Sequence, residues 1–259
     1  MNLIGHNRKH GDCEDVTLHA GDHYYPFEFV LPPTLPSSFE VNHGSVRYFV
    51  KIKIDRPSWH KDYKLTTPFT VLSHLDLNFE ENAMQPNQMN ESKMICCLCC
   101  ATGPVTAQFR IERRGYVPGE GVRIFAEIRN DSDRPILKSK VKLYQKTTLI
   151  SSGGHKNRRT TDLAKIERGR IEGGGSDQWT GETLVIPPCP PSFLRGCSII
   201  DIDHWLTFTA DIEDTPFDLD LELPVIIGTI PLRNLYTVPQ YGGFAPPIGF
   251  QGLYDVKFR

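Results

Sequence analysis

The sequence predicts an all-β protein built from antiparallel β-sandwiches, and three observations predict it. The 21 glycines and 20 prolines are spread along the whole chain and leave little room for long helices. Several segments alternate apolar and polar residues with a period of two, as half-buried strands do. Polar turn sequences separate these segments, and short strands at turn-separated spacing are typical of sandwiches.

Three candidate strands lie in the first third of the chain, at about 24–30, 46–54 and 65–75. The middle one alternates best, with Val46 and Ile54 at the ends of an apolar face and lysines on the other face. Three strands cannot form two packed sheets. This part of the chain therefore predicts an incomplete sandwich.

The region 95–232 predicts a complete sandwich, because it supplies at least six candidate strands. The clearest are 105–113, 122–130 and 217–223, together with a long strand at 200–212. One face of the long strand is apolar and is made of Ile200, Ile202, Leu206, Phe208, Ala210 and Ile212. The opposite face carries aspartates, so we expect one face in the core and one in water.

Three further segments are not expected to form strands. Residues 1–22 are a polar leader without the apolar segment of a secretory signal, which favours the cytosol. Residues 79–94 are polar and are interpreted as a strand-free linker. Residues 233–259 form a Pro/Gly-rich tail. No run of about 18 apolar residues occurs, so no transmembrane helix is expected.

Composition and motifs exclude some function classes. The 29 basic and 31 acidic residues give a formal net charge of −2, which counts against a general nucleic-acid binder. The sequence contains no recognisable nucleotide-binding, hydrolase, kinase or zinc-protease motif. We therefore expect no catalytic residue, no metal site and no cofactor.

A tight turn is predicted at Val117-Pro118-Gly119-Glu120. Pro118 sets φ for the second position of a type II turn, and Gly119 takes the positive φ that the third position needs. The turn is expected to join the strands near 105–113 and 122–130 into a hairpin.

Four cysteines crowd into five residues, at Cys96, Cys97, Cys99 and Cys100. A redox motif would need a following helix, and a zinc site would need a second, separated ligand pair. Three interpretations stay open: a structural strand, reversible acylation of the thiols, and metal or redox chemistry.

Lysines recur at even positions from Lys138 through Lys140 and Lys142 to Lys146, and on a strand they share one face. We call these four residues the lysine stripe. The stripe is either a binding face for an acidic or phosphorylated partner or for anionic lipid, or an ordinary solvated sheet face.

Ten short runs of sequence together resemble the arrestin superfamily, specifically the arrestin domain-containing proteins (alpha-arrestins). Before the linker they are YPFEFVLPP from Tyr25, HGSVRYFVK from His43 and PFTVL from Pro68. After it come CCLC from Cys96, GPV from Gly103, IERRGYVPGE from Ile111, IFAEI from Ile124, IPP from Ile186, CSII from Cys197 and LPVIIGTIPL from Leu223. They follow the family's order over roughly residues 20–232.

The resemblance implies two tandem immunoglobulin-like β-sandwiches, a partial arrestin N domain at 23–78 and an arrestin C domain at 95–232. It implies a non-catalytic adaptor that binds membrane-protein cargo, such as receptors or transporters, and recruits HECT-type ubiquitin ligases for endocytosis and sorting. Such a protein is cytoplasmic and peripheral at the plasma membrane or endosomes.

Two departures from the family pattern qualify this expectation. The match begins well inside the N domain, so the opening strands of that sandwich are expected to be missing. The chain has no Pro-Pro-x-Tyr motif, through which the family recruits WW domains, and this counts against ligase recruitment. The alternative interpretation is a truncated structural β-sandwich product without cargo or ligase recruitment.

Overall fold

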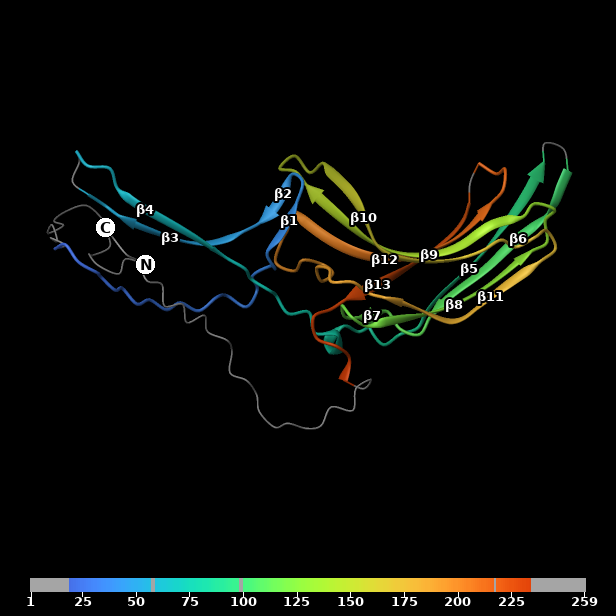
Figure 1. Cartoon of the computed structure of the whole chain (residues 1–259), viewed down its shortest axis with the longest axis horizontal. Helices are drawn as coiled ribbons and strands as arrows, with labels where there is room; N and C mark the ends of the chain where they lie inside the picture. Colours follow the sequence, from blue (N-terminus) through green and yellow to red (C-terminus); the bar gives the residue numbers. More distant parts are fainter. Residues whose placement is uncertain (1–18, 57–58, 98–99, 217, 234–259) are drawn as a thin grey trace. The chain divides into compact units, whose positions relative to one another are not determined.

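The computed structural model describes residues 19–56, 59–97, 100–216 and 218–233 (Figure 1). The chain separates into two units, one formed by 1–33 with 239–259 and the other by 34–238. In the described part of the first unit, rings two residues apart stack at 6.3 Å, both for His23 with Tyr25 and for Phe27 with Phe29. The structure assigns no strand to residues 24–30, so the strand expected there is wrong.

The second unit contains 13 strands and one short 3-10 helix within its described residues. The strands are β1 (Phe39–Val41), β2 (Gly44–Val46), β3 (Tyr48–Ile54), β4 (Tyr63–Phe69), β5 (Asn87–Cys97), β6 (Cys100–Ile111), β7 (Gly115–Tyr116), β8 (Gly121–Asn130), β9 (Ile136–Ile150), β10 (Lys156–Arg168), β11 (Ser176–Val185), β12 (Ile200–Ile212) and β13 (Leu219–Ile227). The helix is η1 (Leu77–Phe79). The all-β prediction is confirmed.

Strands β5 to β13 form a β-sandwich. One sheet has the order β10-β9-β12-β13-β7 and the other β11-β8-β6-β5. Figure 1 shows the two layers, with β9 and β12 facing β8 and β11. All pairings are antiparallel except that of β13 with the short β7.

The sandwich core is made by the inward faces that the alternation predicted. The apolar face expected on 200–212 is buried along β12. Phe208 of β12 lies 5.7 Å from the ring of Phe109 on β6 and meets Trp179 of β11 edge-on at 6.0 Å. Aromatic contacts in these geometries add to the burial energy of the rings.

The N-terminal part of this unit is made of two hairpins. In β1–β2, Phe39 is buried with Leu149, Leu194, Ile200 and Ile202, so this hairpin packs on the sandwich. In β3–β4, apolar residues that lie opposite each other, such as Ile52 and Leu65, form an apolar face. Leu65 is 45% exposed, as expected for a two-stranded sheet.

The expectation that residues 79–94 are strand-free is wrong, because β5 begins at Asn87. The polar composition of β5 hid it from a pattern search. It is an edge strand. Among the described strands it pairs with β6 alone, from Asn87 opposite Ile111 onward, and few of its described side chains enter the core. Strand β4 also ends earlier than expected, at Phe69.

Within the described residues, no helix has the length and apolar character needed to cross a membrane.

Candidate partner-binding surfaces

The lysine stripe lies on the outer face of β9, the second strand of the five-stranded sheet. Its four side chains are half-buried and alternate with fully buried residues, including Ser139, Val141 and Leu143. Buried neighbours on β9 hold the backbone in the sheet, so the stripe has a fixed spacing along the strand.

Carboxylates on the neighbouring strands approach the stripe from both sides. Lys142 Nζ lies 2.8 Å from Asp162 Oδ2 of β10, and Lys138 Nζ lies 4.0 Å from Asp211 Oδ2 of β12. Lys146 Nζ instead lies 5.8 Å from the ring centroid of Trp205, a cation–π contact. The positive charge of the stripe is therefore partly neutralised.

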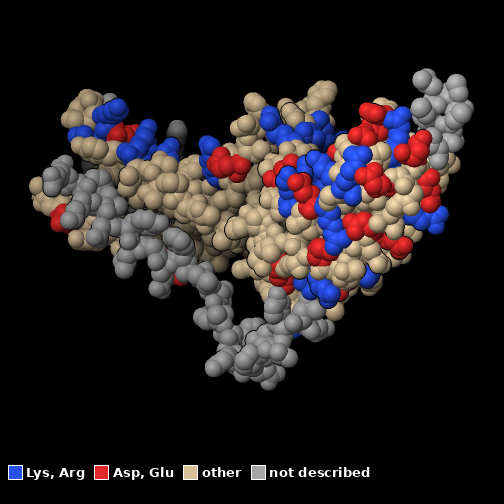
Figure 2. All heavy atoms as spheres, turned by 45° about the vertical axis from the view of Figure 1, so that its right-hand side comes forward, with Lys and Arg blue, Asp and Glu red and all other residues tan. Residues whose placement is uncertain are grey.

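Tyr144 continues this pattern between Lys142 and Lys146. Its hydroxyl donates to Glu222 Oε1 of β13 at 2.9 Å. Burial, followed by the Glu222 carboxylate, raises the pKa of Tyr144 to about 12, so the phenol stays protonated. The outer face is thus one of mixed charge, and Figure 2 shows positive and negative side chains interspersed over the visible face of the sandwich.

The start of β10 adds positive charge to the same sheet. Lys156 and Arg158 are exposed, and within the described residues neither forms an ion pair. Arg159 beside them has a buried Nε, which finds no hydrogen-bond partner in the described part of the chain.

The turn at Val117–Glu120 brings Pro118 and Gly119 to the edge of the sandwich between β7 and β8. Glu120 N–H donates to Val117 O at 3.1 Å, and Gly119 has a φ of 92°. The Glu120 carboxylate accepts from Val117 N–H at 3.0 Å and pairs with Arg113 at 3.0 Å. The turn sequence did not predict that the side chain of its last residue, Glu120, would hydrogen-bond to the backbone of its first residue, Val117.

The cysteine cluster lies where β5 meets β6, with Cys97 opposite Cys100. The Cys99 position and the side chains of Cys96, Cys97 and Cys100 lie outside the described residues, and acylation there stays a prediction. Burial raises the pKa of the Cys189 thiol to about 11, so it is protonated and a poor nucleophile at neutral pH. Among described residues, no three His, Cys, Asp or Glu side chains could hold a metal ion.

A buried histidine is the main polar residue that sequence reasoning missed. His204 is 1% exposed and lies on the inner face of β12, with Nδ1 2.9 Å from Ser192 Oγ. Ser192 Oγ also accepts from Ile227 N–H at 3.0 Å, while His204 Nε2 has no hydrogen-bond partner among the residues that the structure describes. The sequence did hold a signal for its burial: His204 stands at an even position, in line with the apolar residues of 200–212.

Comparison with known proteins places both regions in one family. The profile described as Arrestin (or S-antigen), C-terminal domain, matches residues 101–232, and that of the N-terminal domain matches residues 6–78. The N-terminal match begins inside the segment interpreted as a polar leader.

Curated relatives agree with these domain matches. Arrestin domain-containing protein 4 of Homo sapiens is 38% identical over 220 residues, which cover 85% of this chain and 51% of the relative. Arrestin domain-containing protein 1 of Homo sapiens is 32% identical over 231 residues, covering 89% of this chain and 52% of the relative. The chain therefore spans about half the length of the curated relatives that it matches. On the two domain matches and these relatives, the chain belongs to the arrestin family, among the arrestin domain-containing proteins (alpha-arrestins).

Proposed function

We propose that this chain is a non-catalytic adaptor in protein transport that binds membrane-protein cargo, such as receptors or transporters. It would link that cargo to ubiquitination, endocytosis and sorting from the cytoplasm, as a peripheral protein of the plasma membrane or endosomes. The observation that carries the proposal is the pair of arrestin domain matches, which occur in order along the chain. Arrestin family members are generally non-enzymatic adaptors.

The environments of the buried ionisable groups support a scaffold rather than a catalyst. Burial raises the pKa of Cys189 to about 11 and lowers the pKa of His204 to about 4, so both are uncharged at neutral pH. Within the described residues, the hydrogen-bond partner of His204 is a loop serine, Ser192, and not an ionisable side chain. Neither Cys189 nor His204 is therefore present in a charged form that general acid–base or nucleophilic chemistry would use at neutral pH.

We propose the lysine stripe as the face that meets an acidic or phosphorylated part of the cargo. Because Asp162 and Asp211 already approach Lys142 and Lys138, a partner has to displace existing contacts. Exposed charge contacts contribute about 0.5–1 kcal/mol each, and competition reduces this further. Changing all four lysines to Ser should therefore weaken binding to cell membranes about three- to tenfold at low salt.

Flotation of the purified chain with membranes measures this effect, and the salt dependence separates its causes. Binding of the parent chain should weaken more steeply with salt than binding of the quadruple variant, because screening acts on the removed charges. Lys53→Ser is a control, since Lys53 is exposed on β3, outside the sheet that carries the lysine stripe, and its Nζ lies 3.1 Å from Asp62 Oδ2. If the quadruple variant binds as well as the parent at low salt, the stripe is a solvated face only.

A further inference from the structure

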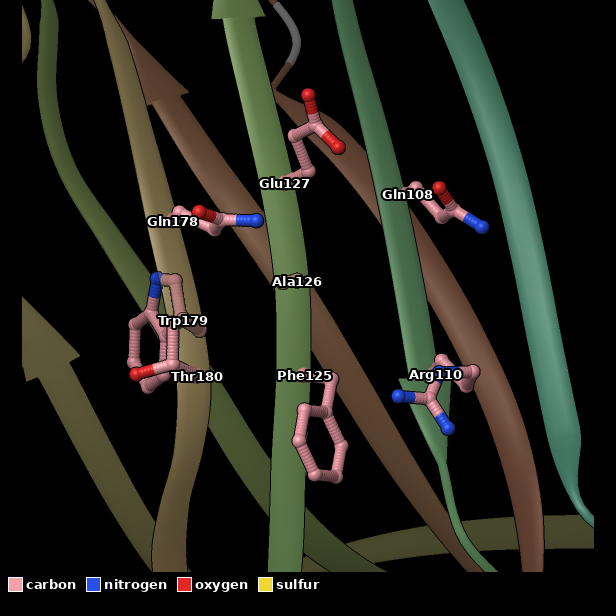
Figure 3. Close-up of a pocket in the computed structure, with 8 residues that line it drawn as sticks. All are labelled: Gln108, Arg110, Phe125, Ala126, Glu127, Gln178, Trp179 and Thr180. Carbon is pink, nitrogen blue, oxygen red and sulfur yellow. The ribbon is translucent and has the colours of Figure 1, made fainter.

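The outer face of the four-stranded sheet contains a hollow of about 350 Å³ across β11, β8 and β6. Side chains from two cross-strand rows line it. One row is Gln178, Glu127 and Gln108, and the other is Thr180, Phe125 and Arg110. Figure 3 shows these six residues around the hollow, on the three strands that carry them. The hollow is on the opposite sheet from the lysine stripe.

Arg110 is held on an aromatic ring instead of pairing with an acid. Its Cζ lies 4.4 Å from the centroid of Phe125, and Figure 3 shows the guanidinium extending toward that ring. Within the described residues Arg110 forms no ion pair. An Arg stacked on a ring keeps its N–H groups free at the ring edge, in the geometry that suits a carboxylate.

A second arginine fixes Phe125. Arg123 Cζ lies 5.3 Å from the same centroid, and Arg123 pairs with Glu112 at 3.4 Å. Gly181, at the bulge of β11, leaves room for the Arg123 side chain, because a Cβ at Gly181 would lie 3.0 Å from Arg123 Nη2. The ring and the Arg110 guanidinium are therefore pre-positioned.

Glu127 supplies the opposite charge in the other row. It is exposed, and among the described residues its carboxylate forms no hydrogen bond or ion pair. Glu127 and Phe125 are two residues apart on β8, so the two rows are about 6.7 Å apart. In Figure 3 the Glu127 side chain extends away from Phe125, which separates the negative site from the positive one.

We propose that this hollow binds an extended peptide segment of a partner protein in which an acidic and a basic side chain are two residues apart. In an extended peptide such side chains share one face and are about 6.7 Å apart, which is the spacing of the two rows. The acidic side chain meets Arg110 and the basic one meets Glu127. Gln108 and Gln178, which flank Glu127, provide amide groups for the peptide backbone.

This inference adds a second surface to the proposed adaptor function and does not depend on the lysine stripe. The two surfaces differ in what they recognise, because the stripe carries one sign of charge and the hollow carries both. A variant of the stripe should leave peptide binding at the hollow unchanged. Failure of either proposal can therefore be told apart from failure of the other.

The test uses the full chain and four fluorescein-labelled serine-rich nonapeptides that differ only at two positions. These carry Glu-Ser-Lys, Lys-Ser-Glu, Glu-Ser-Glu or Lys-Ser-Lys at the centre. Fluorescence anisotropy at low salt should give at least one mixed-charge peptide about tenfold tighter binding than either like-charge peptide. Equal binding of all four peptides, or no binding, would overturn the proposal.

Charge reversal assigns the binding to the hollow. Glu127→Lys should shift the preference to Glu-Ser-Glu, and Arg110→Glu should shift it to Lys-Ser-Lys. The control variant combines Lys165→Glu with Glu167→Lys, an exposed pair of opposite charges two residues apart on β10. The control should keep the parent preference. If Glu127→Lys and Arg110→Glu keep it as well, while melting at the parent temperature, the peptide binds elsewhere and the inference is wrong.

Discussion

Gly119 illustrates how a single backbone angle decides which residue a position accepts. Its φ is 92°, and an added Cβ would meet no atom within 4 Å, so backbone strain alone opposes a side chain there. We predict that Gly119→Val lowers the free energy of unfolding by about 1–2 kcal/mol. Urea unfolding of the variant measures this loss. Gly169 is also in open space and lacks a positive φ, so Gly169→Val should cost much less; equal losses would contradict the strain argument.

His204 gives the protein a defined response to acid. Burial lowers its pKa from 6.5 to about 4. Below pH 6.5 the unfolded chain therefore binds a proton that the folded chain does not, and the free energy of unfolding falls as pH falls. Between pH 6.5 and 5 this contribution changes by about 1.5 kcal/mol, because half of the unfolded chains are already protonated at this histidine at pH 6.5.

The variant His204→Gln removes the titrating group and should lose that share of the acid sensitivity. Unfolding curves at pH 6.5 and pH 5 measure the loss for each protein. His155→Gln, at an exposed position, is the control and should behave as the parent. A His204→Gln protein with the parent's full loss between these pH values would show that His204 is not the group responsible.

His204 also shows what a residue pattern can and cannot predict. The alternation in 200–212 correctly predicted which face of β12 is buried, because period two is a local property of an extended chain. It did not predict that the polar side chain of His204 would be buried on that face. The group that stabilises His204, Ser192, lies 12 residues earlier in a loop, and no local pattern reports such a contact.

At the scale of elements, one arginine joins the edges of the two sheets. Arg168 of β10 donates from Nη1 to Asp177 Oδ1 at 3.0 Å and to Gln178 O at 2.7 Å, both on β11. Its Nη2 pairs with Glu182, and its Cζ lies 5.0 Å from the centroid of the Trp179 ring. The contacts cross from the edge of one sheet to the edge of the other.

We predict that Arg168→Met costs about 2 kcal/mol of stability, because two partly buried carboxylates lose their cation. Arg170→Met is the matched control, since Arg170 is more exposed and pairs with Glu172 and Glu213. Its loss should be at most about 1 kcal/mol. Thermal unfolding of both variants measures these losses of stability. If Arg170→Met loses as much stability as Arg168→Met, Arg168 does not link the two sheets.

Strands with a strong alternation of apolar and polar residues were mostly predicted correctly. The errors fell where pairing with a neighbouring strand determines whether a segment becomes a strand. The segment 24–30 alternates like a strand, yet the structure assigns none there, because a strand also needs a neighbour to pair with. Strand β5 is the reverse case. Its polar sequence has little alternation, but pairing with β6 along nearly its whole length makes it a strand.

At the scale of the whole molecule, the fold was predictable and the binding surfaces were only partly so. The lysine stripe was predicted to share one face of a strand, and its even spacing was enough for that. The acids that approach it, Asp162 and Asp211, come from two other strands and depend on register. The hollow at Arg110 and Glu127 also depends on register between β6 and β8, which the sequence pattern does not give.

The central claim is that this arrestin-family chain binds protein cargo on membranes, and flotation with protease-shaved membranes tests it most directly. Membranes from cells are prepared in two portions, and the exposed parts of integral proteins are removed from one with a protease that is then inactivated. The purified chain should float with the intact membranes and lose most of this association with the shaved ones. Equal association with both would show lipid binding rather than cargo binding, and no association with either would contradict the adaptor function.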